Sequence, residues 1–336
     1  MRLSDFDYAL PEELIAQEPL AERDRSRLLV ADRERQLIEH RTFADLLDYL
    51  REDDLMVFNN TRVVAARLNG HKDTGGKVEV LLLRSISPGV WEAMVKPGRR
   101  VAVGARLILD QGLTADVIDR SDAGSRILRF AADIDPDELL ARVGQVPLPP
   151  YIHKRLDDPE RYQTVYAAAK GSAAAPTAGL HFTPALLAGI RARGIAMAFV
   201  TLHVGLATFR PVRTENLDDH DMHTEFFEVS PEAAEAVNSA RGRIVCVGTT
   251  TARTLESVAV GKRKIAARSG ETNLFIKPPY DFKIVEALIT NFHTPKSTLL
   301  ILISAFAGTD FVRRAYEEAV RQQYRFLSFG DAMLLY

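Results

Sequence analysis

The chain has 336 residues, of which 46% are hydrophobic and 26% charged, and its formal net charge is -2. This length predicts two domains, and the near-neutral charge argues against an indiscriminate nucleic-acid binder, although one local basic patch could still recognise a particular RNA. The single cysteine, Cys246, excludes an internal disulfide and a cysteine-rich metal site. The longest apolar run, Leu299 to Ala307, is too short to span a bilayer, and residues 1–7 lack the apolar core of a signal peptide. We therefore expect a cytoplasmic protein with no membrane partner.

The first 61 residues predict a helix, a loop, a second helix and a strand. Pro11 opens the first helix, and Thr42 with Asp45 forms an acidic capping box before the second. Leu55 to Phe58 predicts a short buried strand that ends at the turn formers Asn59-Asn60.

The pattern changes between residues 62 and 150, where short β-type runs are separated by Gly, Pro and Asp. Such regular spacing predicts an inserted all-β domain, either a small barrel or a sandwich. The proline-rich segment 146–150 indicates the return to the main domain, which then comprises residues 1–61 and 151–336. The expected strands are Val78 to Leu83, Val90 to Lys96, Leu107 to Leu109, Leu113 to Ile118 and Arg126 to Phe130.

From residue 184 onward, helices and strands alternate, which predicts an α/β fold with a largely parallel sheet. The helix starts are marked by Thr183-Pro184, Ser230-Pro231 and Thr249 or Thr250. The expected strands are residues 195–202, 243–247 and 272–276.

Three polar clusters follow apolar runs of this region, at residues 203–210, 248–253 and 290–297. Ligands of open α/β sheets bind outside the carboxyl ends of the strands, so we expect these clusters to converge on one site. His181 joins them as a candidate, because it stands in a loop beside Gly179 and just ahead of the helix start at Thr183.

Each cluster also has a simpler interpretation. The segment Gly248-Thr249-Thr250 could be only a capped helix start, and Arg253 with Glu256 could be a solvated ion pair rather than a substrate clamp. His203 and His293 taken singly are more often structural than catalytic.

Other polar groups are weaker candidates. His220, His223 and Glu225 invite a metal interpretation, but their spacing fits no standard zinc signature. Arg62 is either a turn residue or, at the domain junction, a substrate contact. Two basic groups could follow phosphates: Lys96 with Arg99 and Arg100, and Lys262-Arg263-Lys264 with Arg268.

The chain resembles the S-adenosylmethionine:tRNA ribosyltransferase-isomerase family of queuosine biosynthesis along nearly its whole length. The residues at Ala65, Ala207, Thr294 and Pro279 depart from the family pattern, and none of these departures removes a titratable group. The segments that carry the resemblance are Leu3 to Asp7, Asn59 to Arg62, Gly75 to Leu83, Pro149 to Ile152, Arg161 to Tyr166, Ala175 to Thr183, His203 to Val212, Met222 to Glu225, Val247 to Thr250, Arg253 to Ser257, Ala287 to Leu300 and Phe329 to Leu334.

The resemblance implies a mixed α/β domain interrupted by a β-barrel. It implies that S-adenosylmethionine is a co-substrate that donates its ribosyl group, with no permanently bound cofactor, no metal and no obligate protein partner. The acceptor would be 7-aminomethyl-7-deazaguanine at the wobble position of a tRNA with a GUN anticodon. The products would be epoxyqueuosine in the tRNA, adenine and methionine.

The chemistry of this reaction suggests roles for the candidate residues. A base must remove a proton from the carbon beside the sulfonium, and we expect His181 to be that base, with His203 or His293 as a second acid or base. The other expected substrate contacts are Thr249, Thr250 and Arg253 to the methionine carboxylate or a phosphate, Glu225 to its amino group, Phe182 or Phe209 to the unstacked base, and Arg62, Thr177, Gly179, Gly205, Thr208, Arg210, His223, Gly248, Asn291, Lys296 and Ser297.

Two other functions remain as alternatives at this point. The barrel could serve a non-catalytic tRNA-binding protein as its recognition module. A metal-dependent hydrolase could be built on His220 and His223.

Overall fold

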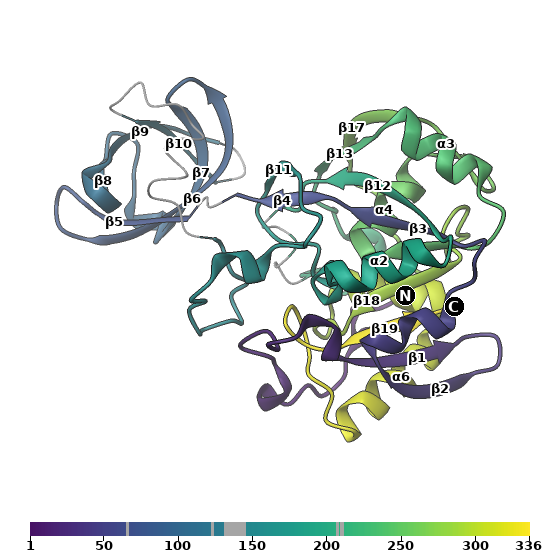
Figure 1. Ribbon diagram of the computed structural model, residues 1–336. Helices are drawn as coiled ribbons and strands as arrows, with labels where there is room; N and C mark the ends of the chain where they lie inside the picture. Colours follow the sequence, from purple (N-terminus) through teal and green to yellow (C-terminus); the bar gives the residue numbers. More distant parts are fainter. Residues whose placement is uncertain (65–66, 122–123, 131–145, 206–207, 209–211) are drawn as a thin grey trace. The chain divides into compact units, whose positions relative to one another are not determined.

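The computed structural model describes residues 1–64, 67–121, 124–130, 146–205, 208 and 212–336 (Figure 1). The chain forms two compact units. The first comprises Met1–Arg62 with Pro149–Tyr336, and the second comprises Val63–Leu148.

A mixed sheet of nine strands forms the centre of the first unit. The pairs β12/β3, β3/β14, β14/β18 and β19/β1 are parallel, and the other neighbouring pairs are antiparallel. The expectation of a largely parallel sheet therefore holds only for its central strands. In sheet order the strands are β17 (Arg268–Thr272), β13 (Glu225–Val229), β12 (Ala196–Leu202), β3 (Leu55–Asn59), β14 (Ile244–Val247), β18 (Ala287–Asn291), β19 (Ala332–Leu335), β1 (Arg27–Asp32) and β2 (Leu37–Thr42).

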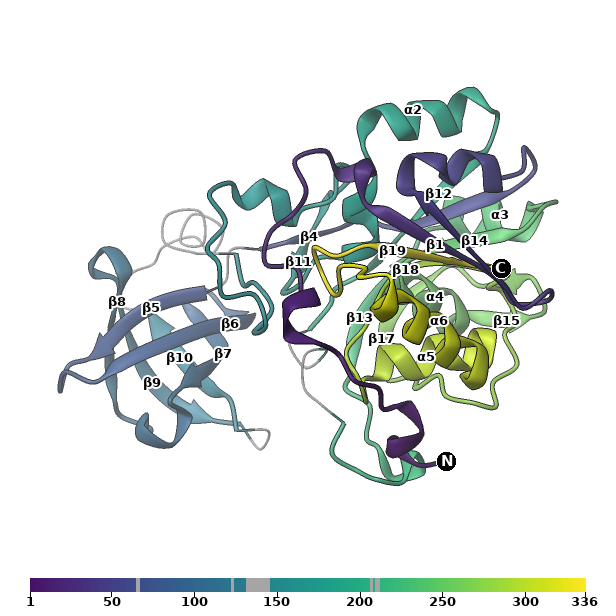
Figure 2. The same ribbon diagram turned by 90° about the horizontal axis from the view of Figure 1, so that it is seen from below.

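Helices cover both faces of this sheet (Figure 2). One face packs against α3 (Pro231–Ser239), α4 (Thr249–Ser257), α5 (Thr298–Ala307) and α6 (Thr309–Arg321), and the other against α2 (Pro184–Ala192) and the 3₁₀ helix η4 (Phe43–Tyr49). Strand β3 shows how one sequence serves both cores, since Leu55 and Val57 enter the first core and Met56 and Phe58 enter the second. This alternation follows from the two-residue period of a strand.

Smaller elements complete the first unit. Two short strand pairs lie outside the main sheet, β4 (Thr61–Val63) with β11 (Ala169–Ser172) and β15 (Ala259–Gly261) with β16 (Lys264–Ile265). The remaining 3₁₀ helices of the unit are η1 (Leu3–Phe6), η2 (Glu12–Leu14), η3 (Arg23–Arg25), η7 (Pro159–Tyr162), η8 (Thr177–His181) and η10 (Leu217–Asp219).

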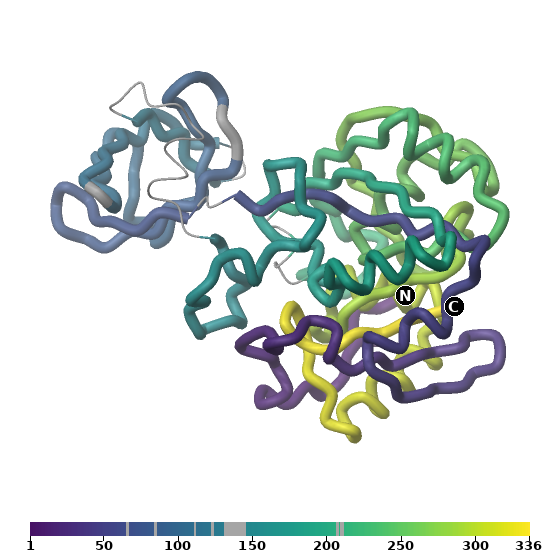
Figure 3. Tube along the Cα trace, viewed as in Figure 1, coloured from purple at the N-terminus to yellow at the C-terminus, as the bar shows by residue number. Residues whose placement is uncertain are grey.

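The N-terminal and C-terminal segments of the first unit are interleaved (Figure 3). Strand β1 pairs in parallel with β19, so Leu28 lies opposite Ala332 and Val30 lies opposite Leu334. The sheet therefore joins residues that are about 300 positions apart in the sequence.

The second unit is a closed antiparallel barrel with the strand order β10-β7-β6-β5-β8-β9. The fold is thus a mixed α/β domain with a β-barrel, which confirms the expected fold class. The barrel contains the strands β5 (Arg67–Lys72), β6 (Lys77–Ser87), β7 (Val90–Lys96), β8 (Arg106–Leu109), β9 (Thr114–Arg120) and β10 (Arg126–Phe130), and the 3₁₀ helices η5 (Gly98–Arg100) and η6 (Asp110–Gly112).

The structure corrects several local expectations. The expected strand at 272–276 is wrong, since β17 covers Arg268–Thr272 and residues 273–276 lie outside the strands and helices. The helix expected at Pro11 is a single 3₁₀ turn. The hairpin of β1 and β2 was not anticipated, because the helix signals at Pro11 and Thr42 dominate this part of the sequence.

The N-cap of α2 is Thr183, as the sequence predicts. Thr183 Oγ1 accepts a hydrogen bond from Leu186 N at 3.1 Å and donates one to Asp24 Oδ2 at 3.0 Å. We expect Thr183→Ala to lower the free energy of unfolding by about 1 kcal/mol, because a first-turn amide loses its acceptor. Denaturant titration measures this loss, and Thr183→Ser, which keeps the hydroxyl, is the control; an equal loss in both variants would contradict the capping role.

Candidate functional site

A cavity of about 320 Å³ lies in the first unit, where the central parallel strands end. Strands β12, β14 and β18 are parallel members of the sheet, so their carboxyl ends reach the same edge. Residues after each of these ends border the cavity, as the sequence predicts. Its lining is Tyr151, Ala174, Ala175, Pro176, Thr177, Ala178, Val204, Thr208, Gly248, Thr249, Thr250, Thr290, Asn291, Phe292, His293, Thr294, Pro295, Lys296, Ser297, Leu299, Leu327 and Ser328.

Asn59, at the end of β3, connects the elements at this edge. Its carboxamide is fully buried, and its oxygen accepts hydrogen bonds from the amides of Thr61 and Leu202, each at 3.1 Å. Its nitrogen donates to Leu202 O at 3.0 Å and to Thr250 Oγ1 at 3.3 Å. One side chain thus fixes the end of β12, the start of β4 and the first turn of α4.

Helix α4 directs its N-terminus at the cavity through Gly248, Thr249 and Thr250. Gly248 is the N-cap, with a φ of 91° that glycine adopts without strain, and no side chain caps the helix. The first-turn amides and the helix dipole favour a negatively charged group at this position.

The loop at residues 293–297 forms another wall and is held by the N-terminal segment. Tyr8 Oη donates to His293 O at 2.5 Å, Lys296 N donates to Phe6 O at 2.9 Å, and Lys296 Nζ pairs with Asp7 Oδ2 at 2.7 Å. Ser297 Oγ accepts from Leu300 N at 3.2 Å and so caps α5. Lys296 and Ser297 therefore have structural partners as well as positions on the cavity.

His293 is the histidine among the described residues that borders this cavity. Its Nε2 hydrogen-bonds with Thr290 Oγ1 at 2.8 Å, and burial lowers the pKa of its imidazole to about 3. The ring is therefore neutral at physiological pH, and one of its two nitrogens carries no proton.

His181 lies outside the lining of this cavity. It is 4% exposed, stacks on Phe43 with ring centroids 4.9 Å apart, and hydrogen-bonds with Ser26 and Asn291. Burial is the largest effect that lowers the pKa of His181 to about 3, and the nearby Arg325 and Arg23 add to it. His181 borders a separate recess of about 20 Å³.

His203 is also outside the lining of the cavity. Its Nδ1 hydrogen-bonds with Thr61 Oγ1 at 2.8 Å, and its ring stacks on Phe226. Burial lowers the pKa of His203, and a Cβ on Gly171 would lie 2.8 Å from its Nε2. The three candidate catalytic histidines therefore occupy three separate environments.

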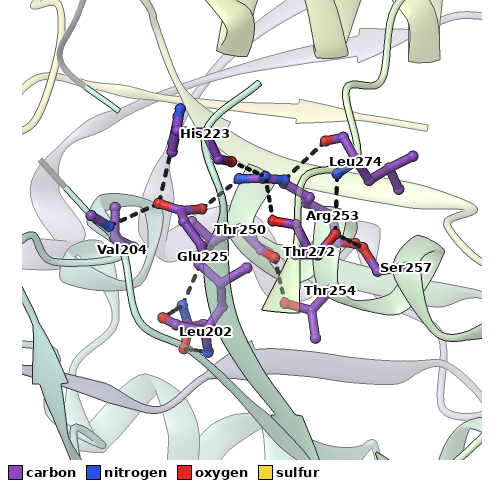
Figure 4. Close-up of polar contacts among 12 residues, drawn as sticks. Leu202, Val204, His223, Glu225, Thr250, Arg253, Thr254, Ser257, Thr272 and Leu274 are labelled. Atoms are coloured by element: carbon purple, nitrogen blue, oxygen red, sulfur yellow. Dashed lines mark hydrogen bonds and ion pairs between the residues drawn. The ribbon is translucent and has the colours of Figure 1, made fainter. Parts of the chain in front are cut away.

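Arg253 of α4 and Glu225 at the start of β13 form a buried ion pair (Figure 4). Arg253 Nη1 lies 2.5 Å from Glu225 Oε2, and its other nitrogens donate to the carbonyl oxygens of His223, Thr272 and Leu274. The solvated ion pair of Arg253 with Glu256 is wrong, because both side chains are buried and the Glu256 carboxylate instead accepts hydrogen bonds from the amides of residues 283–285.

Besides Arg253, the Glu225 carboxylate has a backbone partner and a histidine neighbour. Gly205 N donates to Glu225 Oε1 at 2.8 Å, and His223 Nε2 lies 3.5 Å from the same oxygen (Figure 4). A recess of about 20 Å³ is bordered by Glu225, Arg253, Thr249 and Thr250, and by Thr208 from the main cavity. These residues place a buried charge pair directly beside the cavity.

The other expected site residues have different positions. Phe182 is fully buried and packs edge-on against Phe43 and Phe58, so it is a core residue and the stacking role is wrong for it. Gly179 is needed for packing, since a Cβ there would lie 2.0 Å from the hydroxyl of Tyr166, and Arg62 pairs with Glu160. The expected contacts Phe209 and Arg210, like the departure at Ala207, lie outside the described residues.

Tyr151 and Ser328 meet on the cavity wall, with side-chain oxygens 2.7 Å apart, and neither was anticipated from the sequence. Burial raises the pKa of Tyr151 to about 12. The position of Tyr151, directly after Pro149-Pro150 where the chain re-enters the main domain, could have indicated it. No local sequence pattern distinguishes Ser328, which lies shortly before β19 and is placed at the site by the tertiary fold.

Among the residues that the structure describes, no three His, Cys, Asp or Glu side chains are grouped so that they could hold a metal ion. His220, His223 and Glu225 therefore form no such group. Among the helices that the structure describes, none has the length and apolarity required to cross a bilayer.

A cavity of this size, bordered by a neutral histidine and a helix N-terminus at the carboxyl edge of parallel strands, is typical of an enzyme that binds a small substrate with an anionic group. A family model described as a queuosine biosynthesis protein matches residues 3–335. The S-adenosylmethionine:tRNA ribosyltransferase-isomerases of Symbiobacterium thermophilum and Caldanaerobacter subterraneus are 55% and 54% identical, with 100% of each chain covered. The crystal structure of the S-adenosylmethionine tRNA ribosyltransferase of Thermotoga maritima, 41% identical, gives a TM-score of 0.58 over 99% of this chain and 100% of that one. The chain belongs to the S-adenosylmethionine:tRNA ribosyltransferase-isomerase family, which confirms the resemblance.

The two buried histidines predict an acid-sensitive fold. The unfolded chain takes up protons on His181 and His293 near pH 6.5, whereas the folded chain does so only near pH 3. The contribution of these two histidines to the free energy of unfolding is therefore fully present above pH 6.5. It falls as the pH decreases below 6.5, by about 2 kcal/mol for each histidine at pH 5.

We expect His181→Gln to remove one of these contributions, because glutamine does not titrate. Denaturant unfolding at pH 7 and pH 5 should show a smaller loss for this variant than for the wild type. His153→Gln, on an exposed side chain, is the matched control. An unchanged loss in His181→Gln would contradict burial of the neutral ring.

Proposed function

We propose that this chain transfers and isomerises the ribosyl moiety of S-adenosylmethionine onto 7-aminomethyl-7-deazaguanine at the wobble position of tRNA. The products are epoxyqueuosine in the tRNA, adenine and methionine, and the reaction takes place in the cytoplasm on tRNAs with a GUN anticodon. The observation that carries this proposal is the cavity that His293 shares with the N-terminus of α4, in a chain that matches proteins named for this activity over its full length. The names of these relatives favour catalysis over the RNA-binding alternative.

The charges around the cavity support binding of the methionine part of S-adenosylmethionine. The N-terminus of α4 and the side chain of Thr249 offer hydrogen-bond donors to its carboxylate. The recess beside Glu225 has the volume of a single small polar group and suits its ammonium. Arg253, which already donates to four partners, supports Glu225 rather than the substrate directly.

The acid and base requirements of the reaction favour His293. The positive sulfur acidifies the adjacent ribose carbon, so a neutral imidazole can remove the proton that starts ring opening. His293 is neutral, borders the cavity and is oriented by Thr290. The apolar parts of Tyr151, Phe292 and Leu299 in the lining reduce the water around a bound substrate.

Adenine release from S-adenosylmethionine tests the proposed function. Purified protein should release adenine with tRNA that carries the aminomethyl-deazaguanine, and should release none with unmodified tRNA. Release that is independent of the modified base would contradict the proposed acceptor. Absence of release, with binding of the tRNA intact, would favour the RNA-binding alternative.

We expect His293→Ala to lower kcat for adenine release by about 10²- to 10⁴-fold, because the reaction loses its proton acceptor. Binding of S-adenosylmethionine, measured by calorimetry, should change little. His153→Ala, an exposed histidine outside the cavity lining, is the matched control. A kcat within threefold of wild type for His293→Ala would exclude His293 as the acid or base.

The barrel presents exposed cations that suit the phosphates of the tRNA. Lys96 ends β7, and Arg99 and Arg100 follow in η5, all three with exposed side chains. Such cations contribute to RNA affinity by releasing counterions, in a salt-dependent manner.

We expect the triple variant Lys96→Ala, Arg99→Ala, Arg100→Ala to weaken tRNA binding. The slope of log affinity against log salt should fall by about 0.7 to 0.9 for each phosphate that the variant no longer neutralises. Fluorescence anisotropy measures this slope, and Lys262→Ala with Lys264→Ala is the control from the other exposed basic group. An unchanged slope would remove the barrel from the tRNA interface.

A further inference from the structure

His181 is a buried titratable group that no step of the proposed chemistry uses. It lies at the end of η8, and it is linked to residues from two other parts of the chain. Its Nδ1 is 2.7 Å from Ser26 Oγ, just before β1, and its Nε2 is 3.1 Å from Asn291 Nδ2 at the end of β18. All three side chains are at least 96% buried, with exposed fractions of 2% for Ser26, 4% for His181 and 2% for Asn291.

Ser26, His181 and Asn291 form a chain of hydrogen bonds. A backbone carbonyl oxygen at each end of this hydrogen-bond chain fixes the direction of its bonds. Ser26 Oγ donates to Arg23 O at 3.2 Å, so the same oxygen accepts from His181 Nδ1. Asn291 Nδ2 donates one hydrogen to Leu327 O at 3.1 Å and its other hydrogen to His181 Nε2. Because a carbonyl oxygen can only accept, His181 carries its proton on Nδ1 and accepts at Nε2.

The opposite tautomer is costly in these surroundings. A proton on His181 Nε2 would face the amide hydrogens of Asn291, and turning the carboxamide over would leave Leu327 O without its donor. An unsatisfied buried group costs about 1 to 3 kcal/mol. The imidazolium form is disfavoured as well, because burial and the neighbouring cations Arg325 and Arg23 oppose a positive charge on the ring.

Asn291 connects the hydrogen-bond chain to the cavity, because Asn291 is one of the residues that line it. One amide hydrogen is held by Leu327 O and the other by His181 Nε2, so these two acceptors together hold the carboxamide in its orientation. Its Oδ1 is buried and has no hydrogen-bond partner among the described residues. A substrate N–H that reaches this wall would satisfy that oxygen.

We propose that His181 is a positioning residue which, together with Ser26, fixes the carboxamide of Asn291 against the cavity, and that it transfers no proton in the reaction. The proposal rests on the proposed function for its kinetic consequences. It assigns a role to Ser26, and it changes the expected role of His181 from that of the base. The substrate contact of the chain is Asn291, and the acid or base is the cavity-facing His293.

Two substitutions of His181 separate positioning from proton transfer. His181→Gln places an acceptor where Nε2 stands and so keeps the bond from Asn291, whereas His181→Asn keeps only a donor toward Ser26. We expect kcat for adenine release to remain within about tenfold of wild type in His181→Gln and to fall by about 10- to 100-fold in His181→Asn. A loss of 10³-fold or more in both variants would overturn the proposal, since neither amide titrates.

A double-mutant cycle tests whether His181 acts through Asn291. We expect Asn291→Ala and the double variant His181→Ala, Asn291→Ala to have the same kcat within threefold, because the second change removes nothing further. Additive losses would contradict the linkage. Far-ultraviolet circular dichroism and thermal unfolding identify any variant that fails to fold, and the pH profile of His181→Gln should match that of wild type.

The ring nitrogens of His181 give a readout that does not depend on catalysis. Nitrogen-15 NMR of the labelled protein should show a neutral ring protonated on Nδ1 from pH 5.5 to 8.5, and Ser26→Ala should alter this signal. Titration in that range, or a proton on Nε2, would overturn the proposal. Wild-type protein that releases no adenine but shows this tautomer would refute the proposed function and leave the hydrogen-bond chain established.

Discussion

The geometry of the site depends on the buried carboxamide of Asn59. Its oxygen accepts two hydrogen bonds and its nitrogen donates two, and these four bonds join three parts of the carboxyl edge. A fully satisfied amide in a low-dielectric interior gives rigidity, because any displacement leaves several groups unpaired at once. The end of β12, the departure of the chain into β4 and the first turn of α4 are therefore held in one arrangement. The cavity is the space that this arrangement leaves open.

Local signals in the sequence predicted much of the framework around that edge. The N-caps Thr183 and Ser230 and the capping box of Thr42 with Asp45 are present, because such bonds join residues only a few positions apart. The polar clusters after β12, β14 and β18 were also found, since parallel strands place their carboxyl ends together. The barrel strands β7 and β10 have the bounds that their alternation predicted.

Roles that depend on distant partners could not be predicted in the same way. Arg253 lies one helical turn from Glu256, yet it pairs with Glu225, 28 positions away, since the sheet brings β13 beneath α4. His181 is separated from Ser26 by 155 positions and from Asn291 by 110, so no spacing rule indicates that its nitrogens are occupied. From the sequence, a histidine near a helix start is a candidate acid or base. The stacking of Phe43 on His181 and the hydrogen bonds of His181 show that its ring is enclosed.

The interleaving of β1 with β19 has a consequence for synthesis on the ribosome. The chain emerges N-terminus first, so β1 and β2 are made long before β19, the parallel neighbour of β1. Tyr8 and Asp7 likewise cannot form their contacts with His293 and Lys296 until the loop at 293–297 has been made. Such distant pairings slow folding and leave the edge of β1 that receives β19 unpaired during translation. The barrel, whose strands all lie between residues 67 and 130, can close while the C-terminal strands of the sheet are still being made, whereas the cavity needs Leu327 and Ser328 and is complete only after these residues have been made.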